Sequence, residues 1–358
     1  METLILALNS GSSSLKYGVF EAGATNVRTV ASGTVTSDSA RRDVMDEISS
    51  KLGGRRPQAI GHRIVHGGPN LFDPVVIDRQ VVEKLQAACA FAPLHAAPAL
   101  ALISAAQRHF PQTPQVACFD TGFHATLPPV AAVLPVPKPL RAAGIRRYGF
   151  HGLSCQSILR QLGADLPQRL VIAHLGSGAS VTAVLGGISI DTSMGLTPSG
   201  GVVMATRSGD LDPGLLLFLM REHGLDAVAL EDFVDRRSGL LGISGCSGDL
   251  RMLRHSADDA KDAQLAIAIF CRSVAKHIAT MIVSLGGVNM IVFSGGIGEH
   301  DAETRDAICR DLAWAGVRQP GQADGGVSVR VVRADEEEQI AHQVCALMRR
   351  EHAPDPPA

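Results

Sequence analysis

Short apolar runs and apolar residues at helical spacing alternate along the chain. Residues 3–8 (TLILAL) and 15–20 (LKYGVF) are apolar runs on either side of a small, hydroxyl-rich turn, which predicts a β-hairpin in a half-buried sheet. Residues 79–90 place apolar side chains at helical spacing. Residues 98–110 begin with a proline, which suits the first position of a helix, and stop before Pro111. Both of these stretches therefore predict helices.

The second half of the chain continues this alternation. Asp212 and Pro213 predict the start of a helix that Gly224 ends. Residues 262–285 are apolar at helical spacing, with Gly286 as their cap. Strands and helices are interspersed throughout, and the predicted fold class is α/β.

One strand–turn–strand pattern occurs twice. Residues 170–187 (LVIAHLGSGASVTAVLGG) repeat the layout of the opening segment, and aligning residues 10–13 with residues 177–180 superposes the two serine–glycine turns. Two such hairpins, one near the start of each half, indicate a duplicated domain with a cleft between the copies. Chance similarity is the alternative, because hairpin turns made of small residues are common.

A third glycine-rich turn lies between a strand and a helix. Residues 290–299 (MIVFSGGIGE) run from an apolar strand into Gly295, Gly296 and Gly298, and a helical pattern follows at 302–314. Glycines at such a junction let backbone N–H groups approach an anionic ligand. Neither this turn nor the first matches the P-loop or the G-x-G-x-x-G dinucleotide pattern. Three turns of this kind in one chain predict a phosphorylated ligand.

Composition and charge limit the class of protein. The 358 residues favour two domains, and 46% hydrophobic with 4% aromatic residues describes an ordinary globular protein. A formal net charge of −2 argues against a nucleic-acid partner and against a polybasic membrane-binding segment. The seven cysteines form no C-x-x-C pair, which predicts reduced, mostly buried thiols. The N-terminus lacks a basic n-region and no apolar run reaches membrane-spanning length, so we expect a cytoplasmic protein without membrane contact.

Histidines and arginines recur in five further stretches, four of which contain glycine. They are GHRIVHGG (61–68), PLHAAP (93–98), FDTGFH (119–124), RRYGFHG (146–152) and VVMATRSGDLDP (202–213). Any single histidine is more often a hydrogen-bonded core residue than a ligand, and no H-E-x-x-H motif supports catalytic zinc. Arg207 follows a short apolar run, and its planar guanidinium matches phosphate oxygens.

These stretches, in this order and over essentially the entire chain, resemble the acetokinase family. LNSGSSSLK (8–16) matches the family's N-x-G-S-S-S-x-K signature, and the later stretches, with HLGSGAS (174–180) and FSGGIGE (293–299), follow the family's order. The resemblance implies the sugar-kinase and actin superfamily. It therefore implies an α/β fold of duplicated ribonuclease-H-like (actin-like ATPase) domains, with mixed sheets flanked by helices and an active site in the interdomain cleft.

The resemblance also implies a domain division and an activity. Residues 1–123 with the C-terminal helix at about 338–358 would form the first domain, and residues 124–337 a nucleotide-binding second domain through which a homodimer forms. The implied reaction transfers the γ-phosphoryl group of ATP to acetate, reversibly and with Mg²⁺ or Mn²⁺, giving acetyl phosphate and ADP. Propionate or another short carboxylate is an alternative acceptor. A more remote alternative is an actin-like nucleotide-binding protein without catalysis.

Matched position by position, the resemblance assigns roles to individual residues. The implied catalytic residues are Arg63, Asp120, His151 and Arg207. Nucleotide, phosphates and metal would be held by Asn9, Ser12, Ser14, Lys16, His174, Ser177, Gly178, Asp249, Leu250, Arg251, Gly296, Ile297 and Glu336, with Asn9 and Glu336 nearest the metal. Val65, Leu94, Phe150 and Pro198 would form the acyl pocket, with Arg63 at the substrate carboxylate. His95 matches a further motif histidine.

The chemistry of the implied acceptor qualifies the role of Asp120. Acetate has a pKa of about 4, like a side-chain carboxylate, and is ionised at neutral pH, so this acceptor needs no general base. We therefore expect Asp120 to organise magnesium and its waters rather than accept a proton. Two arginines, Lys16, His151 and Mg²⁺ would offset the repulsion between an anionic nucleophile and an anionic phosphate.

The sequence departs from the family pattern at four places. Ser177 stands where the family usually has asparagine, TPSGG (197–201) where it has T-P-L-E-G, and ADEEE (334–338) where it has T-N-E-E-L. The chain is also shorter, with the trimming between about residues 21 and 55, away from the motifs. These departures leave the preferred acyl group open. They predict nucleotide binding that is modified rather than lost.

Overall fold

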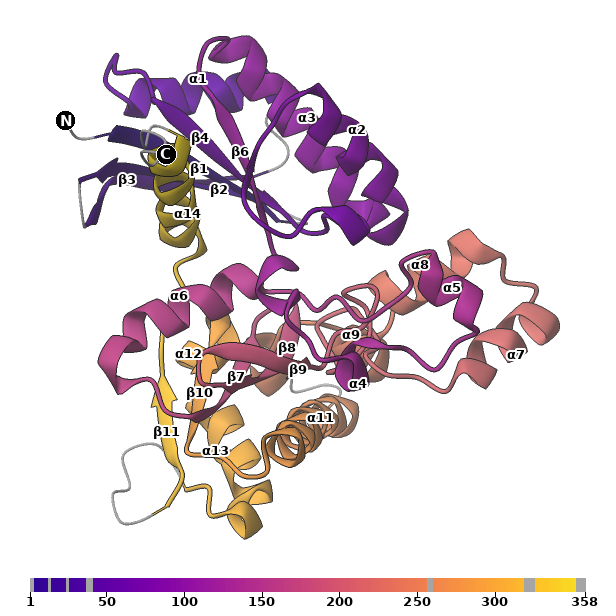
Figure 1. Cartoon of the computed structure of the whole chain (residues 1–358). Coiled ribbons are helices and arrows are strands. Elements are labelled where there is room, and N and C mark those ends of the chain that lie inside the picture. The colour runs from indigo at the N-terminus through magenta and orange to yellow at the C-terminus, as the bar shows by residue number, and fades with distance from the viewer. Residues whose placement is uncertain are drawn as a thin grey trace. The chain divides into compact units, whose positions relative to one another are not determined.

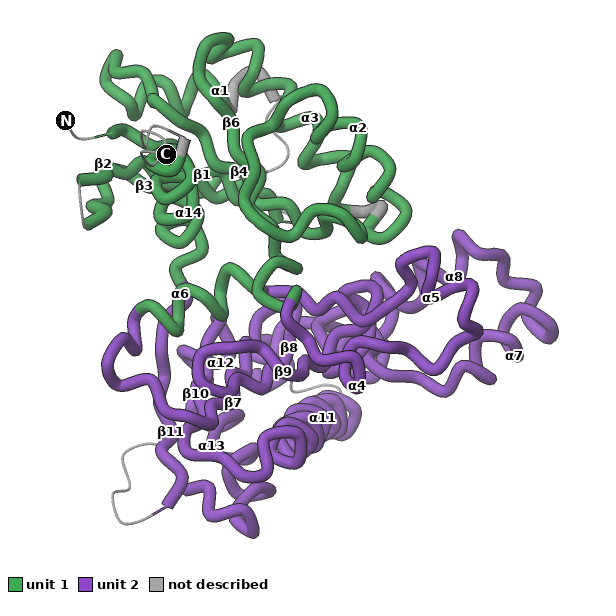
Figure 2. Tube along the Cα trace, in the orientation of Figure 1, with its two compact units in different colours: residues 1–125, 152–160, 335–358 green, residues 126–151, 161–334 purple. Residues whose placement is uncertain are grey.

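The chain folds into two compact units, each built around one β-sheet. The computed structural model describes residues 3–11, 14–23, 26–36, 41–255, 260–318 and 326–351. Unit 1 comprises residues 1–125, 152–160 and 335–358, and unit 2 comprises residues 126–151 and 161–334 (Figure 2). The expected division differs mainly at 152–160. This helical segment packs with unit 1, because Leu153 belongs to the same buried cluster as Ile5 and Ile340.

Unit 1 contains a six-stranded sheet. Its strands are β1 (Thr3–Ser10), β2 (Ser14–Ala22), β3 (Val27–Thr36), β4 (Ala59–Ile64), β5 (Val75–Val76) and β6 (Gln115–Phe119), in the order β3-β2-β1-β4-β6-β5. β1 and β2 form the predicted antiparallel hairpin, in a register that pairs Ser10 with Leu15. β4 is parallel to β1, and β6 is parallel to β4. The carboxyl ends of β1, β4 and β6 therefore lie along one edge of the sheet.

Helices cover both faces of this sheet. They are α1 (Arg41–Lys51), α2 (Arg79–Ala87), α3 (Pro93–His109) and α14 (Glu336–Glu351), with short 3₁₀ turns η1 (Gly68–Asn70), η2 (Ala88–Phe91) and η3 (Gly122–His124). α6 (Gly152–Leu162) begins in unit 1, where Leu153 joins the core, and ends in unit 2. Leu4, Leu6 and Leu8 of β1 pack with residues of α1 and α3. Ile5 and Ala7 point to the other face and pack with α14, which lies against β1 and β2 (Figure 1). Two covered faces explain why β1 is apolar at nearly every position.

The predicted helices of this unit form with shifted boundaries. The helix expected at 79–90 ends at Ala87 and continues as the 3₁₀ turn η2. The expectation that Pro98 starts a helix is wrong, because α3 begins at Pro93 and contains Pro98. Pro93 occupies the position that the sequence argument gave to Pro98. The C-terminal end was predicted correctly, since α3 ends at His109 before Pro111.

Unit 2 repeats the sheet order of unit 1. Its strands are β7 (Arg169–Leu175), β8 (Ala179–Leu185), β9 (Ile188–Thr192), β10 (Met290–Ser294) and β11 (Ser328–Val331), in the order β11-β10-β7-β8-β9. An antiparallel hairpin leads to a third antiparallel strand, and two parallel strands follow on the other side. β1 to β4 and β6 follow the same plan. The predicted duplication is confirmed.

The helices of unit 2 include two whose ends were predicted from capping residues. They are α4 (Pro129–Ala132), α5 (Lys138–Ala142), α7 (Pro213–His223), α8 (Ala227–Arg236), α9 (Gly239–Ser244), α10 (Leu250–His255), α11 (Ala260–Leu285), α12 (Gly295–His300) and α13 (Ala302–Asp311), with 3₁₀ turns η4 (Gly163–Asp165) and η5 (Ala313–Ala315). Asp212 caps α7 by accepting from the Gly214 N–H, and Gly224 ends it in the left-handed conformation. α11 spans the predicted segment and is followed by Gly286 with a φ of +64°.

One helix corrects the expectation that no apolar segment is long enough to span a bilayer. Residues Lys261–Leu285 of α11 reach that length with a mean hydropathy of 1.5. α11 packs against β7, β8 and β9 and contributes buried residues such as Phe270 and Ile278. Its apolar composition is therefore explained by its place on the sheet of unit 2. The seven cysteines, all within the described residues, are free thiols and five of them are buried, as predicted.

Candidate functional site

Four polar residues of unit 1 gather at the carboxyl edge of its parallel strands. Asn9 lies near the end of β1, Arg63 near the end of β4, and Asp120 directly after β6. Glu336 is the first residue of α14. Parallel neighbours bring their carboxyl ends to one edge of a sheet, which is where α/β proteins place their ligands. Three strands that are far apart in sequence thus bring these side chains together.

Hydrogen bonds join these residues into one network, here called the carboxylate–arginine cluster (Asn9, Arg63, Asp120, Glu336, Glu337). Arg63 donates to Asp120 Oδ2 from Nε (2.9 Å) and Nη2 (2.6 Å), and to Asn9 Oδ1 from Nη1 (3.0 Å). Asn9 Nδ2 donates to Glu336 Oε2 (2.8 Å) and to Glu337 Oε1 (2.7 Å). Ser154 donates to Glu336 Oε1. The Arg63 guanidinium is therefore held in a fixed orientation.

The electrostatics of this cluster are dominated by negative charge. Burial raises the pKa of Asp120 to about 6, although Arg63 opposes the shift, and Glu336 adds to it. Burial also raises the pKa of Glu337, and Glu336 contributes to this shift. Burial alone would lower the pKa of Arg63, but Asp120, Glu336 and Glu337 outweigh it and raise that pKa. The three neighbouring carboxylates therefore determine the direction of the pKa shift of Arg63. For Asp120, burial and the neighbouring Glu336 determine the direction of the pKa shift.

The donor set of this cluster fits a hard divalent cation. Its oxygens are carboxylate and amide oxygens, which Mg²⁺ prefers, and its carboxylates outnumber the one arginine. Asp120 Oδ1 is buried without a hydrogen-bond partner of normal geometry among the described residues. Within the same described residues, no group of three or more His, Cys, Asp or Glu side chains is placed to ligate one ion together. Such a site suits Mg²⁺ that keeps several water or phosphate oxygens.

Other predicted residues of unit 1 lie near this edge or in the helices behind it. Lys16 is exposed on β2 and pairs across the hairpin with Asn9. Ser12 lies outside the described residues, as do the side chains of Ser14 and Leu94. Val65 and His95 line a cavity of about 10 Å³ together with residues of α2 and α3. That volume is on the scale of one water molecule.

Two motif histidines of unit 1 have structural partners. His62 bonds the Gln115 side chain (2.7 Å), and burial lowers its pKa to about 4, so it is neutral at physiological pH. His66 Nδ1 accepts from the Gly68 N–H (2.9 Å), and its ring stacks on Phe91. The interpretation that a single histidine is usually a hydrogen-bonded core residue holds for both of them.

In unit 2, a histidine and an arginine meet at the turn between β7 and β8. A Cβ atom added to Gly178 would lie 3.3 Å from His151 Nε2 and 3.4 Å from Arg207 Nη1. His151 Nδ1 contacts Ser180 Oγ at 2.9 Å, and its ring centroid lies 4.6 Å from that of His174. When Ser180 donates to Nδ1, the proton of neutral His151 is on Nε2, which faces Gly178. We call these residues the histidine–arginine cluster (His151, His174, Gly178, Ser180, Arg207).

Backbone conformation marks His151 as an unusual position. Its φ of +58° is the only positive value for a non-glycine residue in the described part of the chain. Such a conformation costs energy and occurs preferentially at functional sites. Neighbouring Phe150 is buried, and so is Pro198, whose carbonyl accepts a hydrogen bond from Arg207 Nη1 (3.3 Å). Ser177 is exposed at the turn itself.

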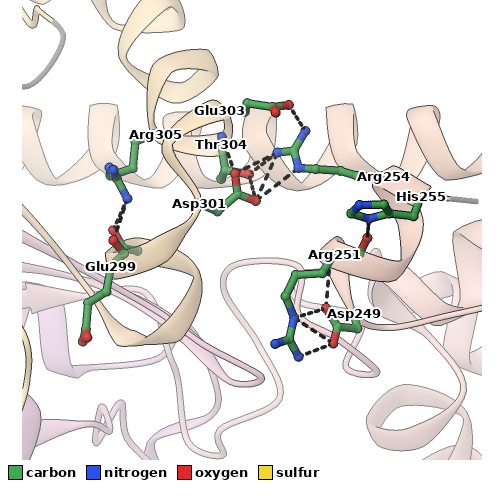
Figure 3. A network of polar contacts seen from close by, with 10 residues as sticks. Asp249, Arg251, Arg254, His255, Glu299, Asp301, Glu303, Thr304 and Arg305 are labelled. Carbon is green, nitrogen blue, oxygen red and sulfur yellow. Dashed lines mark hydrogen bonds and ion pairs between the residues drawn. The ribbon is translucent and has the colours of Figure 1, made fainter.

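The remaining predicted nucleotide residues lie at two short helices of unit 2. Gly296 is exposed and Ile297 half-buried in the first turn of α12, directly after β10. Asp249 precedes α10, where its carboxylate pairs with Arg251 (2.6 Å), and Leu250 is buried (Figure 3). Figure 3 also shows Arg254 of α10 bonded to Asp301, which caps α13. An ion pair thus fixes α10 relative to α13.

Sequence reasoning missed three residues that belong to the two clusters or bond to them. Glu337 bonds Asn9 beside Glu336, and Ser154 bonds Glu336 from α6. Ser180 bonds His151 from β8. Ser180 aligns with Ser13 in the internal repeat, and Glu337 stands beside the assigned glutamate, so both positions carried a weak signal. Nothing in the sequence distinguished Ser154.

The sheet order repeated in both units defines an actin-like ATPase fold, and guanidinium and imidazole groups at strand ends suit phosphoryl transfer. The class is therefore an α/β phosphotransferase. A family model described as the acetokinase family matches residues 45–341. An acetate kinase of Rhodopseudomonas palustris is 36% identical over 395 aligned positions that cover 97% of this chain and 99% of that protein.

Solved structures agree with the sequence matches. A propionate kinase from Francisella tularensis has a TM-score of 0.86 at 34% identity, covering 96% of this chain and 99% of that one. An acetate kinase from Porphyromonas gingivalis has a TM-score of 0.84 at 31% identity, covering 97% and 100%. The chain belongs to the acetokinase family. It is an enzyme that transfers a phosphoryl group to a carboxyl group.

Proposed function

We propose that this enzyme transfers the γ-phosphoryl group of ATP to acetate, reversibly, giving acetyl phosphate and ADP. The observation that carries this proposal is the partly buried Arg63 guanidinium, oriented by Asp120 and Asn9 at the strand ends of unit 1. A fixed guanidinium matches a carboxylate or a phosphoryl group with two parallel N–H groups. The names of the relatives and their near full-length alignment support acetate as the acceptor.

The proposed step needs charge stabilisation rather than proton transfer. An acetate oxygen forms a bond to the γ-phosphorus, and the bond from that phosphorus to the bridging oxygen of ADP breaks. The acceptor is already ionised at neutral pH, because its pKa is about 4. The barrier arises from bringing two anions together, which positive groups lower by stabilising the spread charge of the transition state.

Individual roles follow from the two clusters. Arg63 is proposed to hold the acceptor carboxylate and the transferring phosphoryl group, and Asp120 to orient Arg63. In unit 2, His151 and Arg207 are proposed to donate to phosphoryl oxygens from the glycine turn at Gly178. Bound Mg²⁺, or Mn²⁺, would neutralise phosphate charge, with Asn9, Asp120 and Glu336 orienting it and its waters.

Nucleotide and acyl group are assigned to the other predicted residues. The nucleotide and its phosphates would contact the loops that carry Ser12, Ser14, Lys16, His174, Ser177, Asp249, Leu250, Arg251, Gly296 and Ile297. The acyl methyl would contact Val65, Leu94, Phe150 and Pro198. Exposure of Gly296 and Ser177 leaves backbone and hydroxyl groups of these turns accessible to a nucleotide.

A hydroxamate assay tests the proposal directly. Purified enzyme is incubated with ATP, Mg²⁺, acetate and hydroxylamine, which converts acetyl phosphate to a hydroxamate that forms a coloured complex with Fe³⁺. We expect turnover by the wild type and a severe loss, mainly in kcat, for Arg63→Ala and Arg207→Ala. Wild-type enzyme that formed no acyl phosphate from any short carboxylate would contradict the proposed function and favour an actin-like nucleotide-binding role.

Propionate is the second candidate acceptor. The propionate kinase of Francisella tularensis is as similar in structure to this chain as the acetate kinase of Porphyromonas gingivalis is. One methylene in an apolar pocket changes specificity by only about 1–3 kcal/mol. Comparing kcat/KM for acetate, propionate and butyrate in the same assay decides between the two, with the larger value identifying the preferred acceptor.

Assembly and location complete the proposal. We propose a cytoplasmic homodimer without nucleic-acid or membrane partners, in line with the family resemblance and the net charge of −2. Light scattering coupled to size-exclusion chromatography would give twice the chain mass of 37.6 kDa for a dimer. A mass equal to one chain would contradict this part of the proposal.

A further inference from the structure

Arg207 lies in a loop, residues 201–210, whose two ends are joined by hydrogen bonds. Asp210 Oδ1 accepts from the Gly201 N–H (2.7 Å), and the Asp210 N–H donates to the Gly201 carbonyl (2.9 Å). Gly201 and Gly209 have φ values of +87° and +68°. A Cβ atom at either glycine would lie within 3 Å of backbone oxygen, of Ser193 or of Gly201. The loop therefore has a defined path that only glycines allow at its two ends.

One residue of α8, Asp235, accepts hydrogen bonds from two positions of this region: Ser199, in the arm that precedes the loop and contains Pro198, and Thr206, within the loop. Ser199 Oγ donates to Asp235 Oδ1 (2.5 Å), and Thr206 Oγ1 donates to the Asp235 carbonyl (2.8 Å). Asp235 is the penultimate residue of α8. Ser199 belongs to TPSGG, which departs from the family pattern T-P-L-E-G at this position. The hydroxyl–carboxylate bond is thus a feature of this chain that the family pattern does not contain.

The backbone on the Arg207 side is fixed in the same way. Ser208 N–H donates to the Val234 carbonyl (2.9 Å), and Ser238 N–H donates to the Thr206 carbonyl (3.0 Å). Leu240 N–H donates to the Met204 carbonyl (2.9 Å). With the backbone fixed at both sides of Arg207, the remaining freedom is in its side chain and in the Pro198 arm that it contacts.

We propose that Ser199 and Asp235 are positioning residues for Arg207. Their hydrogen bond fixes the arm that presents the Pro198 carbonyl, and this carbonyl accepts from Arg207 Nη1 on the side of the guanidinium that approaches Gly178. This inference rests on the proposed contact between Arg207 and the transferring phosphoryl group. A small misplacement of such a group lowers the rate of the chemical step more than it weakens ground-state binding.

The first test removes the hydroxyl. Ser199→Ala is expected to lower kcat roughly threefold to tenfold, the size of one hydrogen bond, with KM for ATP and acetate within about twofold of wild type. Ser199→Thr keeps the hydroxyl and is expected to restore kcat. Ser284→Ala is the matched control, because Ser284 Oγ also donates to an aspartate, Asp191 (2.8 Å), in the same unit. Its kcat is expected to equal that of wild type.

The second test asks whether the effect passes through Arg207. Asp235→Ala should give the same loss as Ser199→Ala, and the double variant no more than the larger single loss. In an Arg207→Lys background, where the planar fork is absent, Ser199→Ala should change kcat little.

The outcomes distinguish a failure of the inference alone from a failure of the proposed function. An inactive wild type would overturn the proposed function and the inference together. An active wild type with unchanged kcat in Ser199→Ala would overturn the inference alone. So would an equal loss in the Arg207→Lys background, because that result would indicate a general structural defect rather than a positioning role.

Discussion

At the scale of single residues, the geometry distinguishes motif residues that join one hydrogen-bonded cluster from motif residues that only pack in the core. Arg63, Asp120, Asn9 and Glu336 came from four motifs, and hydrogen bonds join them into one cluster. His62, from the same motif as Arg63, is instead a neutral core residue bonded to Gln115. Motif membership alone did not predict which residues join the cluster and which are neutral core residues.

Replacement of Arg63 should affect stability as well as turnover. Arg63→Ala leaves Asp120 and two glutamates without their cation, and breaking such a buried pair costs about 3–5 kcal/mol. Arg63→Lys keeps the charge but loses the planar fork, so we expect a smaller loss of stability with kcat still lowered by more than tenfold. Urea unfolding and the hydroxamate assay measure the two effects. Arg272→Ala, which breaks an ion pair of a largely exposed arginine with Asp311, is the control and should change neither by much.

The pKa of Asp120 predicts how stability depends on pH. A folded-state pKa of about 6, against 3.8 for the unfolded reference, means that the native state binds more protons between these values. Stability from this group is therefore greatest at low pH, falls as pH rises from about 4 to 6, and is constant above that. The difference in unfolding free energy between wild type and Asp120→Asn should follow this course. A difference that grew with pH would mean that pairing with Arg63 outweighs burial.

At the scale of elements, capping residues predicted both ends of one helix, whereas one proline did not start the helix expected from it. Asp212 and Gly224 mark the two ends of α7 as predicted. Pro98 did not start α3, because the preceding Pro93 begins the helix and the chain tolerates a second proline in its second turn. A proline restricts its own φ angle but does not decide which of two prolines is the first helical residue.

The turn between β7 and β8 gives a prediction at this scale. A side chain at residue 178 would contact His151 Nε2 and Arg207 Nη1, so Gly178→Val should displace both groups. We expect kcat to fall by more than tenfold with little change in the melting temperature, because the added carbons reach side chains rather than backbone. Gly195→Ala is the control, since a Cβ atom there meets nothing within 4 Å. Full activity in Gly178→Val would argue against a catalytic role for the histidine–arginine cluster.

At the scale of the whole molecule, the repeated sheet order shows that the two units share one topology. In each unit the first strand of the hairpin lies in the middle of the sheet, and its neighbours are one antiparallel and one parallel strand. The candidate residues of unit 1 lie at the ends of β1 and β4, directly after β6 and at the start of α14, and those of unit 2 gather at the turn between β7 and β8. The two sets differ in chemistry, with carboxylates gathered in unit 1 and histidines in unit 2.

Metal removal tests the whole enzyme. With excess EDTA we expect turnover to fall to the background rate and to return with Mg²⁺ or Mn²⁺, because the proposed reaction needs a cation at the phosphates. Glu336→Gln should raise the Mg²⁺ concentration required for half-maximal activity by roughly tenfold or more, in line with the loss of one metal-orienting carboxylate. Glu303→Gln, an exposed glutamate paired with Arg254, is the control. Turnover that persisted in EDTA would contradict the proposed role of the metal.

The sequence by itself determined the α/β class, the two hairpins, the caps of α7 and α11, and the motifs that indicate phosphoryl transfer. These features depend on local periodicity, turn chemistry and residue type, which are written in neighbouring positions. Only the tertiary structure decided that Glu337 and Ser180 belong to the clusters, that Ser154 bonds Glu336, and that Asp235 bonds Ser199 beside the loop of Arg207. Those contacts join positions from about 30 to more than 300 residues apart, and strand order and burial, which no local pattern encodes, bring them within hydrogen-bond distance.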